Sequence, residues 1–252
     1  MRTERGRWAS LVAVASMLVL LSGCASNPAD PGDPLEGVNR DFDAINMHLD
    51  ANILEPVASA YVEYIPGQMR QGVTNFFDNL GTPNDVLNSA LQGKLGDALS
   101  GTGRFVINST IGLAGLFDVA TPMGMEALDE DFGQTLGVWG ADEGAYLVVP
   151  LRGPSSLRDV WDIPVSYFTN PLTYLDLGLY GLPLTVMDAI DTRARLATAI
   201  KISNEALDPY VFRREAYRQR RVDQIYDGNP PDEALDKLDQ ASADAFINLP
   251  TS

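Results

Sequence analysis

Helical periodicity, interrupted at intervals by proline and glycine, restricts the fold of this 252-residue chain more than any other feature. In one predicted helix, apolar residues recur with the spacing of a single helix face: Met69, Val73, Phe76, Phe77 and Leu80. Residues 145–149, just before Pro150, form the one convincing strand pattern and predict a short strand or hairpin near residues 145–151. The pattern as a whole predicts a mainly α single domain over residues 38–226.

Local signals place several element boundaries within this domain. Thr82-Pro83 has the pattern of a helix start, with proline at the first helical position. After the strand, helix is expected to resume at Ser155, and a long amphipathic helix is predicted from about Val186 to Leu207. The apolar residues 171–190 are interrupted by aspartate, glycine and proline, so they are expected to lie at an interface or in the core and not to span a membrane.

The chain begins with the pattern of a secretory signal peptide. Three arginines precede an uncharged run from Trp8 to Leu21, which is shorter than the roughly 20 apolar residues that cross a bilayer. The sequence Leu21-Ser22-Gly23-Cys24 resembles the lipobox of bacterial lipoproteins, in which the cysteine receives diacylglycerol and its new amino terminus an acyl chain. The alternative is an ordinary secretory peptide with an incidental cysteine. Residues 1–23 are therefore predicted to be a lipoprotein signal peptide.

Sequences on either side of the domain are expected to be flexible. Residues 24–37, rich in proline, aspartate and glycine, are predicted to be a lipidated tether that starts at Cys24. Ala25 follows the cysteine, and by the sorting rule of lipoproteins this residue favours release to the outer membrane, on its periplasmic side. Residues 227–252 are predicted to be an acidic, flexible tail with at most one short helix near residues 233–246.

Charge and composition argue against several classes of function. The formal charge is −16, and removal of residues 1–23, which carry three arginines and one glutamate, leaves about −18. Nucleic-acid binding is not expected, because it requires clustered basic residues. The lone cysteine excludes an intramolecular disulfide and zinc sites with paired cysteines, and the lone His48 matches no catalytic or metal-binding spacing. We therefore predict no catalytic residues, no metal and no enzymatic activity.

Two segments allow alternative interpretations. Residues 104–125 are apolar and rich in glycine, which suits either a close helix contact or a flexible surface among lipid tails. Five arginines lie close together near the end of the domain and are expected to form a solvated helix face paired with carboxylates: Arg213, Arg214, Arg218, Arg220 and Arg221. The alternative is that these arginines contact lipid phosphate or an acidic partner.

Several motifs, in a fixed order, resemble the MlaA (VacJ) family of phospholipid-transport lipoproteins over roughly residues 33–226. The matching segments are DPLEGVNR at 33–40, RFVINSTIG at 104–112, DEDFGQTLGVWG at 129–140, GPSSLRD at 153–159 and DPYVFRREAYRQRR at 208–221. The chain departs from the family at Asp43 and Ile45, where phenylalanine is common, and at Ala114, where glycine is common.

The resemblance implies a function in lipid transport. Family members remove mislocalised phospholipids from the outer leaflet of the outer membrane and pass them to the periplasmic carrier MlaC, which maintains lipid asymmetry. The resemblance also implies a ring-shaped helical protein in the inner leaflet, associated with a trimeric porin, and no cofactor other than the covalent lipid on Cys24. The alternatives are a structural, porin-associated lipoprotein without transport activity and, less consistent with the motifs, a lipase.

Polar residues inside otherwise apolar motifs are candidates for a lipid path. A charged lipid head group crosses hydrocarbon at a cost of several kcal/mol unless polar groups line its route. We therefore expect polar side chains from the two glycine-containing motifs to help form that route: Asn108, Ser109, Gln134 and Thr135. Four aromatic side chains are expected to face lipid tails: Phe76, Phe77, Phe105 and Phe117.

Overall fold

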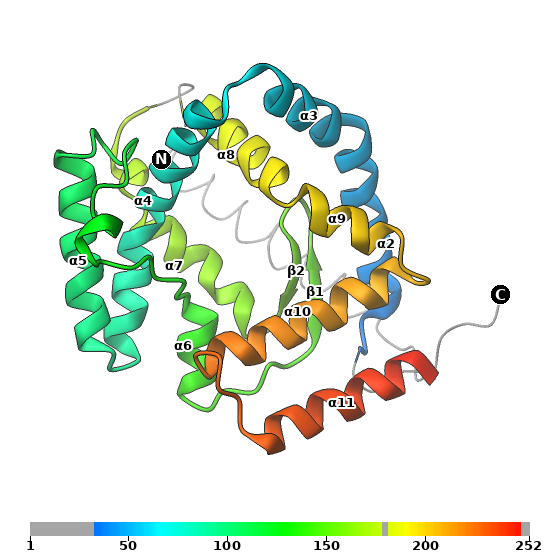
Figure 1. Cartoon of the computed structure of the whole chain (residues 1–252). Coiled ribbons are helices and arrows are strands. Elements are labelled where there is room, and N and C mark those ends of the chain that lie inside the picture. Colours follow the sequence, from blue (N-terminus) through cyan, green and yellow to red (C-terminus); the bar gives the residue numbers. More distant parts are fainter. Residues whose placement is uncertain (1–32, 178–180, 248–252) are drawn as a thin grey trace, which may run out of the picture.

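The computed structural model describes residues 33–177 and 181–247, and helices form most of its regular structure. Figure 1 shows the helices following one another around a ring-like body with a two-stranded hairpin inside it. The predicted mainly α fold with a short hairpin is therefore confirmed. The predicted signal peptide and the first part of the tether, including Cys24, lie outside the described residues.

The first part of the ring is a chain of long helices. Its elements are α2 (Glu36–Leu49), the π-helical turn η1 (Asp50–Leu54), α3 (Glu55–Tyr64), α4 (Gly67–Leu91) and α5 (Leu95–Thr110). The helical backbone continues from α2 through η1 into α3, and the extended residues Ile65 and Pro66 then separate α3 from α4. Helices α4 and α5 pack side by side along the edge of the ring (Figure 1).

The second part contains shorter elements and closes the ring. In chain order they are η2 (Thr121–Met123), α6 (Phe132–Val138), β1 (Tyr146–Val149), β2 (Gly153–Ser156), η3 (Asp159–Trp161), α7 (Asp162–Thr169), η4 (Pro171–Tyr174), α8 (Gly181–Arg195), α9 (Ala197–Asn204), α10 (Pro209–Ile225) and α11 (Asp232–Ile247). Helix α8 packs on α3, and α10 contacts α6, α9, β2 and α11 (Figure 1). The described helices include none that is both long enough and apolar enough to cross a membrane.

The predicted helix start at Thr82-Pro83 is wrong, because α4 continues through Pro83. A proline inside a helix loses one backbone hydrogen bond and costs about 3 kcal/mol. The packing of α4 against α5, α6 and α7 holds the helix together across this position. The Thr82 hydroxyl also donates to the Asp78 carbonyl at 3.1 Å, so the side chain bonds within the helix instead of capping a new one.

Two other predicted boundaries are wrong. Ser155 lies in β2, because the backbone pairs antiparallel with β1 in a register that joins Tyr146 to Ser156 and Val149 to Gly153. The helix predicted over residues 186–207 is two helices, α8 and α9, with a break at Leu196. The break turns α9 so that its Ser203 hydroxyl accepts a hydrogen bond from Arg213 of α10 at 2.9 Å. In both cases a tertiary partner, which local periodicity does not encode, decides the geometry.

The interior of the ring is mainly polar. Among the described residues, buried polar and charged side chains outnumber buried apolar ones by more than two to one. The one apolar core cluster joins the hairpin to α10 and contains Tyr146, Val148, Tyr210 and Val211. Large apolar side chains are exposed on many elements, for example Leu99 at 75% and Leu151 at 81%. This excess of polar over apolar side chains among the buried residues is the reverse of that in a water-soluble globular protein, where charged residues are almost never fully buried unless they are paired.

Candidate functional site

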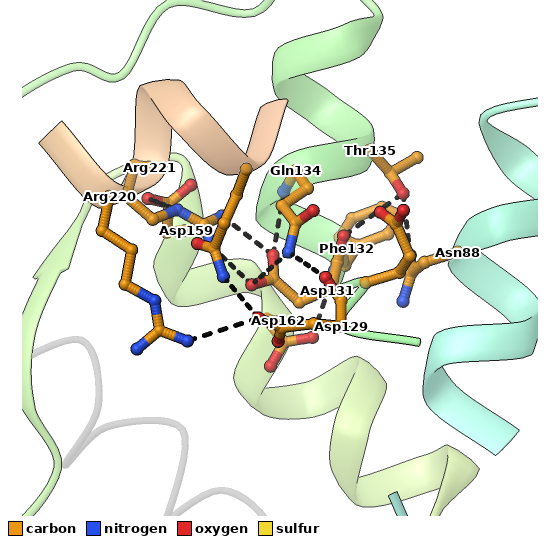
Figure 2. Close-up of polar contacts among 12 residues, drawn as sticks. Asn88, Asp129, Asp131, Phe132, Gln134, Thr135, Asp159, Asp162, Arg220 and Arg221 are labelled. Atoms are coloured by element: carbon orange, nitrogen blue, oxygen red, sulfur yellow. Dashed lines mark hydrogen bonds and ion pairs between the residues drawn. The ribbon is translucent and has the colours of Figure 1, made fainter. Parts of the chain in front are cut away.

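A network of carboxylates, amides and arginines connects α4, α6, η3 and α10 inside the ring (Figure 2). Asp131 is the N-cap of α6 and accepts from the Gln134 backbone amide at 2.8 Å. The same carboxylate accepts from the Arg221 Nη2 at 2.9 Å, and Arg221 Nε lies 3.0 Å from Asp159 Oδ2. One arginine of α10 therefore ties the start of α6 to the segment that follows the hairpin.

Gln134 and Thr135 lie inside this network. The Gln134 side chain, 1% exposed, donates to the Asp129 carbonyl at 2.8 Å, and the Thr135 hydroxyl donates to Asn88 of α4 at 2.9 Å (Figure 2). Gly133 permits this close packing, since a Cβ there would lie 2.4 Å from Asp159 Oδ1. The structure thus places both residues in the polar interior with their hydrogen bonds made to protein. Their contact with a lipid head group stays a prediction.

Asn108 and Ser109 belong to a second network at the end of α5. Asn108 donates to Asp118 at 3.1 Å and accepts from the backbone amides of Val119 and Ala120 at 2.9 and 3.0 Å. Ser109 accepts from Asn79 of α4 at 2.9 Å. Within the described part of the chain, no hydrogen bond joins this pair directly to Gln134 or Thr135. The four candidate path residues are therefore polar interior residues in two separate places.

Asp118 is the acidic centre of the second network. Burial acts to raise the pKa of its carboxyl, but hydrogen bonds from Thr121, Arg104 and Asn108 outweigh burial and lower the pKa to about 2. Arg104 approaches the Asp118 carboxylate to 2.9 Å and also donates to the Met125 carbonyl at 2.8 Å. This carboxylate stays ionised at neutral pH and fixes the chain that follows α5.

The arginines of α10 are paired with carboxylates as predicted, but three of them are buried and not solvated. Arg214 is 1% exposed and binds Asp33 and Glu215, with distances of 3.0 and 2.8 Å. Arg218 and Arg221 are also buried. These residues recur at i, i+4 and i+7, which is the spacing of a core-facing stripe. That spacing was the available signal, and a composition-based interpretation of charge missed it.

The motif at residues 33–40 performs a structural role that the sequence did not reveal. Asp33 is fully buried and accepts hydrogen bonds from Tyr210 of α10 and from Asn39 of α2. Asn39 in turn donates to the Tyr146 carbonyl at 2.9 Å and accepts from the Val148 amide at 2.9 Å. The start of the domain is therefore bound to the hairpin and to α10.

Asp43, where the chain departs from the family, is paired with an arginine. Arg213 of α10 donates to the Asp43 carboxylate from both Nε and Nη2, the first at 3.0 Å. His48, five residues further along α2, is exposed, and its ring Nδ1 lies 3.3 Å from the Asn52 side-chain amide. The acid at residue 43 adds another charge pair between α2 and α10.

A cavity of about 660 Å³ lies under α11, next to the buried arginines. Arg158, Arg218, Arg221 and Glu143 contribute to its wall, and Ala234 and Leu238 of α11 cover it. Burial raises the pKa of the Glu143 carboxyl, while the charges of Arg218 and Arg158 oppose this rise. Helix α11 shows that the predicted tail contains a helix, as the pattern at residues 233–246 indicated.

The four predicted membrane-facing phenylalanines differ in exposure. Phe117 is 59% exposed, whereas Phe76, Phe77 and Phe105 are half-buried. Phe76 and Phe77 pack edge to face, with ring centroids 5.2 Å apart. The glycine-rich segment 104–125 makes the close contact that was one of the two interpretations of its sequence, since Gly112 and Gly115 pack tightly against neighbouring atoms. Ile111 and Leu113 in the same segment are exposed. Contact of these side chains with lipid tails stays a prediction.

Together these features define a helical protein with an ion-paired interior and many exposed apolar side chains. Comparisons with known proteins agree with the motifs. The family model described as MlaA lipoprotein matches residues 31–224. The chain is 36% identical over 217 residues to the Escherichia coli (strain K12) protein named intermembrane phospholipid transport system lipoprotein MlaA, covering 83% of this chain and 86% of that one. The protein of the same name from Haemophilus influenzae is 30% identical over 255 residues, covering 95% of this chain and all of that one.

A solved structure supports the same assignment. The structure described as "Structural basis for maintenance of bacterial outer membrane lipid asymmetry" has 34% sequence identity to this chain and a TM-score of 0.68, and the match covers 78% of this chain and 99% of that one. The chain therefore belongs to the MlaA lipoprotein family.

Proposed function

We propose that this protein is an outer-membrane lipoprotein, anchored through Cys24, that removes mislocalised phospholipids from the outer leaflet and passes them to a periplasmic carrier. The relatives named for intermembrane phospholipid transport, and the related structure described in terms of outer-membrane lipid asymmetry, support this role. The partners in this proposal are membrane phospholipids, a trimeric porin and MlaC. Transport changes no covalent bond, so the role requires no catalytic residue.

The single observation that carries the proposal is that polar side chains predominate among the buried residues, while many large apolar side chains are exposed. In hydrocarbon there is no hydrophobic force that holds helices together, so packing and polar contacts between helices must do so. Ion pairs buried in the ring, such as Arg193 Nη2 with Asp50 Oδ2 at 3.0 Å, join helices without using their apolar faces. The apolar faces then remain available for lipid tails, and a lipid head group can move along polar protein atoms at a lower cost than through hydrocarbon.

A deletion strain tests the proposal. We expect loss of the protein to raise the amount of outer-leaflet phospholipid, and plasmid-borne wild-type protein to restore it. Cys24→Ala, which removes the lipidated residue, should behave like the deletion. Three acyl chains hold a protein durably at a membrane, whereas a protein without acyl chains binds the membrane weakly or not at all. An unchanged outer leaflet in the deletion strain would favour the structural, porin-associated role instead.

A further inference from the structure

An open cleft of about 1070 Å³ lies between α3, the start of α4, α8 and the segment that follows α5. Its volume is at the upper end of the roughly 300–1,000 Å³ range of small-molecule sites. Apolar and polar side chains both line it: Ile65, Met69, Val73, Leu116, Phe117 and Met187 provide apolar surface, and Tyr61, Gln68, Gln71, Asn75 and Asp118 provide polar atoms. The cleft is separate from the network of Figure 2 and shares no lining residue with the cavity under α11.

A tightly packed turn precedes Leu116 and Phe117, which line one side of the cleft. Leu113, Ala114 and Gly115 have successive positive φ angles of 54, 59 and 92°. Such a conformation is strained for residues other than glycine and persists where the surroundings enforce it. Gly115 lies so close to α4 that a Cβ would be 2.5 Å from Asn79 Cβ, and the Asn75 amide donates to the Leu116 carbonyl at 3.3 Å.

The turn keeps apolar side chains exposed. Leu116 is 44% and Phe117 59% exposed, and Met69 across the cleft is 62% exposed. Exposed apolar groups that line a concave surface mark a site for an apolar ligand. The strained backbone therefore positions two apolar side chains at the edge of a cleft instead of burying them.

One unpaired cation lies beside the same cleft. Arg70 is the one basic side chain in residues 33–177 and 181–247 that has no carboxylate within 4 Å; the other described lysines and arginines all have one. Its Nε donates to the carbonyl of the cleft residue Ile65 at 3.1 Å, which fixes the guanidinium at the α3–α4 junction. In a chain with a formal charge of −16, a cation without a carboxylate is available to an external anion.

We propose that this cleft binds one diacyl phospholipid, with the lipid phosphate on the Arg70 guanidinium and an acyl chain along Met69, Leu116 and Phe117. The proposal rests on the proposed function, because it takes phospholipid as the cargo. It adds a specific binding site, at which a lipid is held by its phosphate and one chain. Gln68 and Gln71, on the same helical turns as Arg70, supply neutral hydrogen-bonding groups for the head group.

Binding of a short-chain lipid to the full chain in amphipol tests this site. Dihexanoylphosphatidylglycerol should bind saturably to the wild type, and Arg70→Gln should weaken its binding about tenfold, because a charge-assisted bond to phosphate is lost. Arg70→Lys should fall between them. Lys201→Gln, which removes an exposed lysine paired with Glu205, is the matched control and should bind like the wild type.

Two further ligands distinguish the contribution of the phosphate to binding from that of the acyl chains. Dihexanoylglycerol, which has no phosphate, should bind weakly and equally to the wild type and Arg70→Gln. The Leu116→Asn, Phe117→Gln double variant should weaken binding of both lipids. Inorganic phosphate alone should show no saturable binding. If it binds with the same affinity as dihexanoylphosphatidylglycerol, the cleft is a free-phosphate site and the phospholipid proposal is wrong. Circular dichroism and the thermal midpoint of each variant report whether it is folded.

The site proposal fails if folded Arg70→Gln binds phosphatidylglycerol within twofold of the wild type, or if the wild type binds none. Outer-leaflet phospholipid in complemented deletion cells separates this failure from failure of the proposed function. If the wild type clears the outer leaflet while the binding result fails, only the cleft is rejected. If the wild type does not clear the outer leaflet, the transport role is rejected.

Discussion

Asp85, a half-buried residue of α4, gives the sharpest test of the electrostatics, because the structure places it among other acids. Burial raises the pKa of its carboxyl to about 8, and the charges of Asp129, Glu130 and Asp131 act in the same direction. A carboxyl with a folded-state pKa above its unfolded value of 3.8 binds more protons in the folded state. The stability of the protein should therefore fall as the pH rises from about 4 to about 8.

The size of this loss of stability follows from the raised pKa of the Asp85 carboxyl. Each pH unit in this window should remove up to about 1.4 kcal/mol, so the rise in the pKa of Asp85 from 3.8 to about 8 sets a ceiling of about 6 kcal/mol. Asp85→Asn keeps the size of the side chain and its oxygen acceptor but removes the ionisation. We expect the variant to match the wild type near pH 4.5 and to be more stable by about 2–4 kcal/mol at pH 8, below the ceiling because real sites relax and admit water.

The assay is denaturant unfolding in detergent micelles, followed by circular dichroism at intervals from pH 4.5 to 8.5. Asp41→Asn, which removes an exposed carboxylate on α2, is the control for loss of one surface charge, and we expect an effect within about 0.5 kcal/mol. The difference in unfolding free energy between Asp85→Asn and the wild type must grow with pH. A difference that is constant across this range, or that has the opposite sign, would refute the assignment of a buried acid at residue 85.

Three further changes test the packing of the ring. Ala114→Gly should raise the unfolding free energy by about 1 kcal/mol, because glycine adopts a φ of 59° without strain; no gain in denaturant midpoint would argue that the turn is relaxed. Gly133→Ala should lower stability by about 1–3 kcal/mol, since its Cβ would lie 2.4 Å from Asp159 Oδ1, whereas Gly81→Ala, with no atom within 4 Å of the new Cβ, should be neutral or stabilising. Asp33→Asn should destabilise by about 3–5 kcal/mol, because it leaves the buried Arg214 without one carboxylate partner; a thermal midpoint equal to that of the wild type would contradict this role.

Periodicity and turn residues were sufficient to predict the helical fold and the hairpin. The strand pattern before Pro150 was confirmed as β1, and the five arginines expected on one helix do lie on α10, which begins at Pro209 with Asp208 as its N-cap. The errors at Pro83 and Ser155 share one cause. A proline inside α4 and a second hairpin strand are both stabilised by contacts with distant residues, which a local pattern does not contain.

The candidate site was less predictable, because periodicity does not show whether the apolar face of a helix contacts protein or lipid. Alternation of apolar and polar residues shows which helix faces differ, and the usual rule then places the apolar face inside. Here the arginine stripe at residues 214, 218 and 221 occupies a buried face of α10, and large apolar residues such as Leu99 and Leu151 are exposed. The unpaired state of Arg70 was also beyond reach of the sequence, since it depends on which of 34 acidic residues lie nearby in space.

The contact between Asp33 and Arg214 has a consequence for biosynthesis. These residues are 181 positions apart, so the first buried carboxylate of the domain meets this guanidinium only after almost the whole chain has been made. Until then the early helices lack the later helices that they pack against, and the Asp33 carboxylate stays in water. Shortening the chain before residue 214 should therefore yield an insoluble product, not a smaller functional ring.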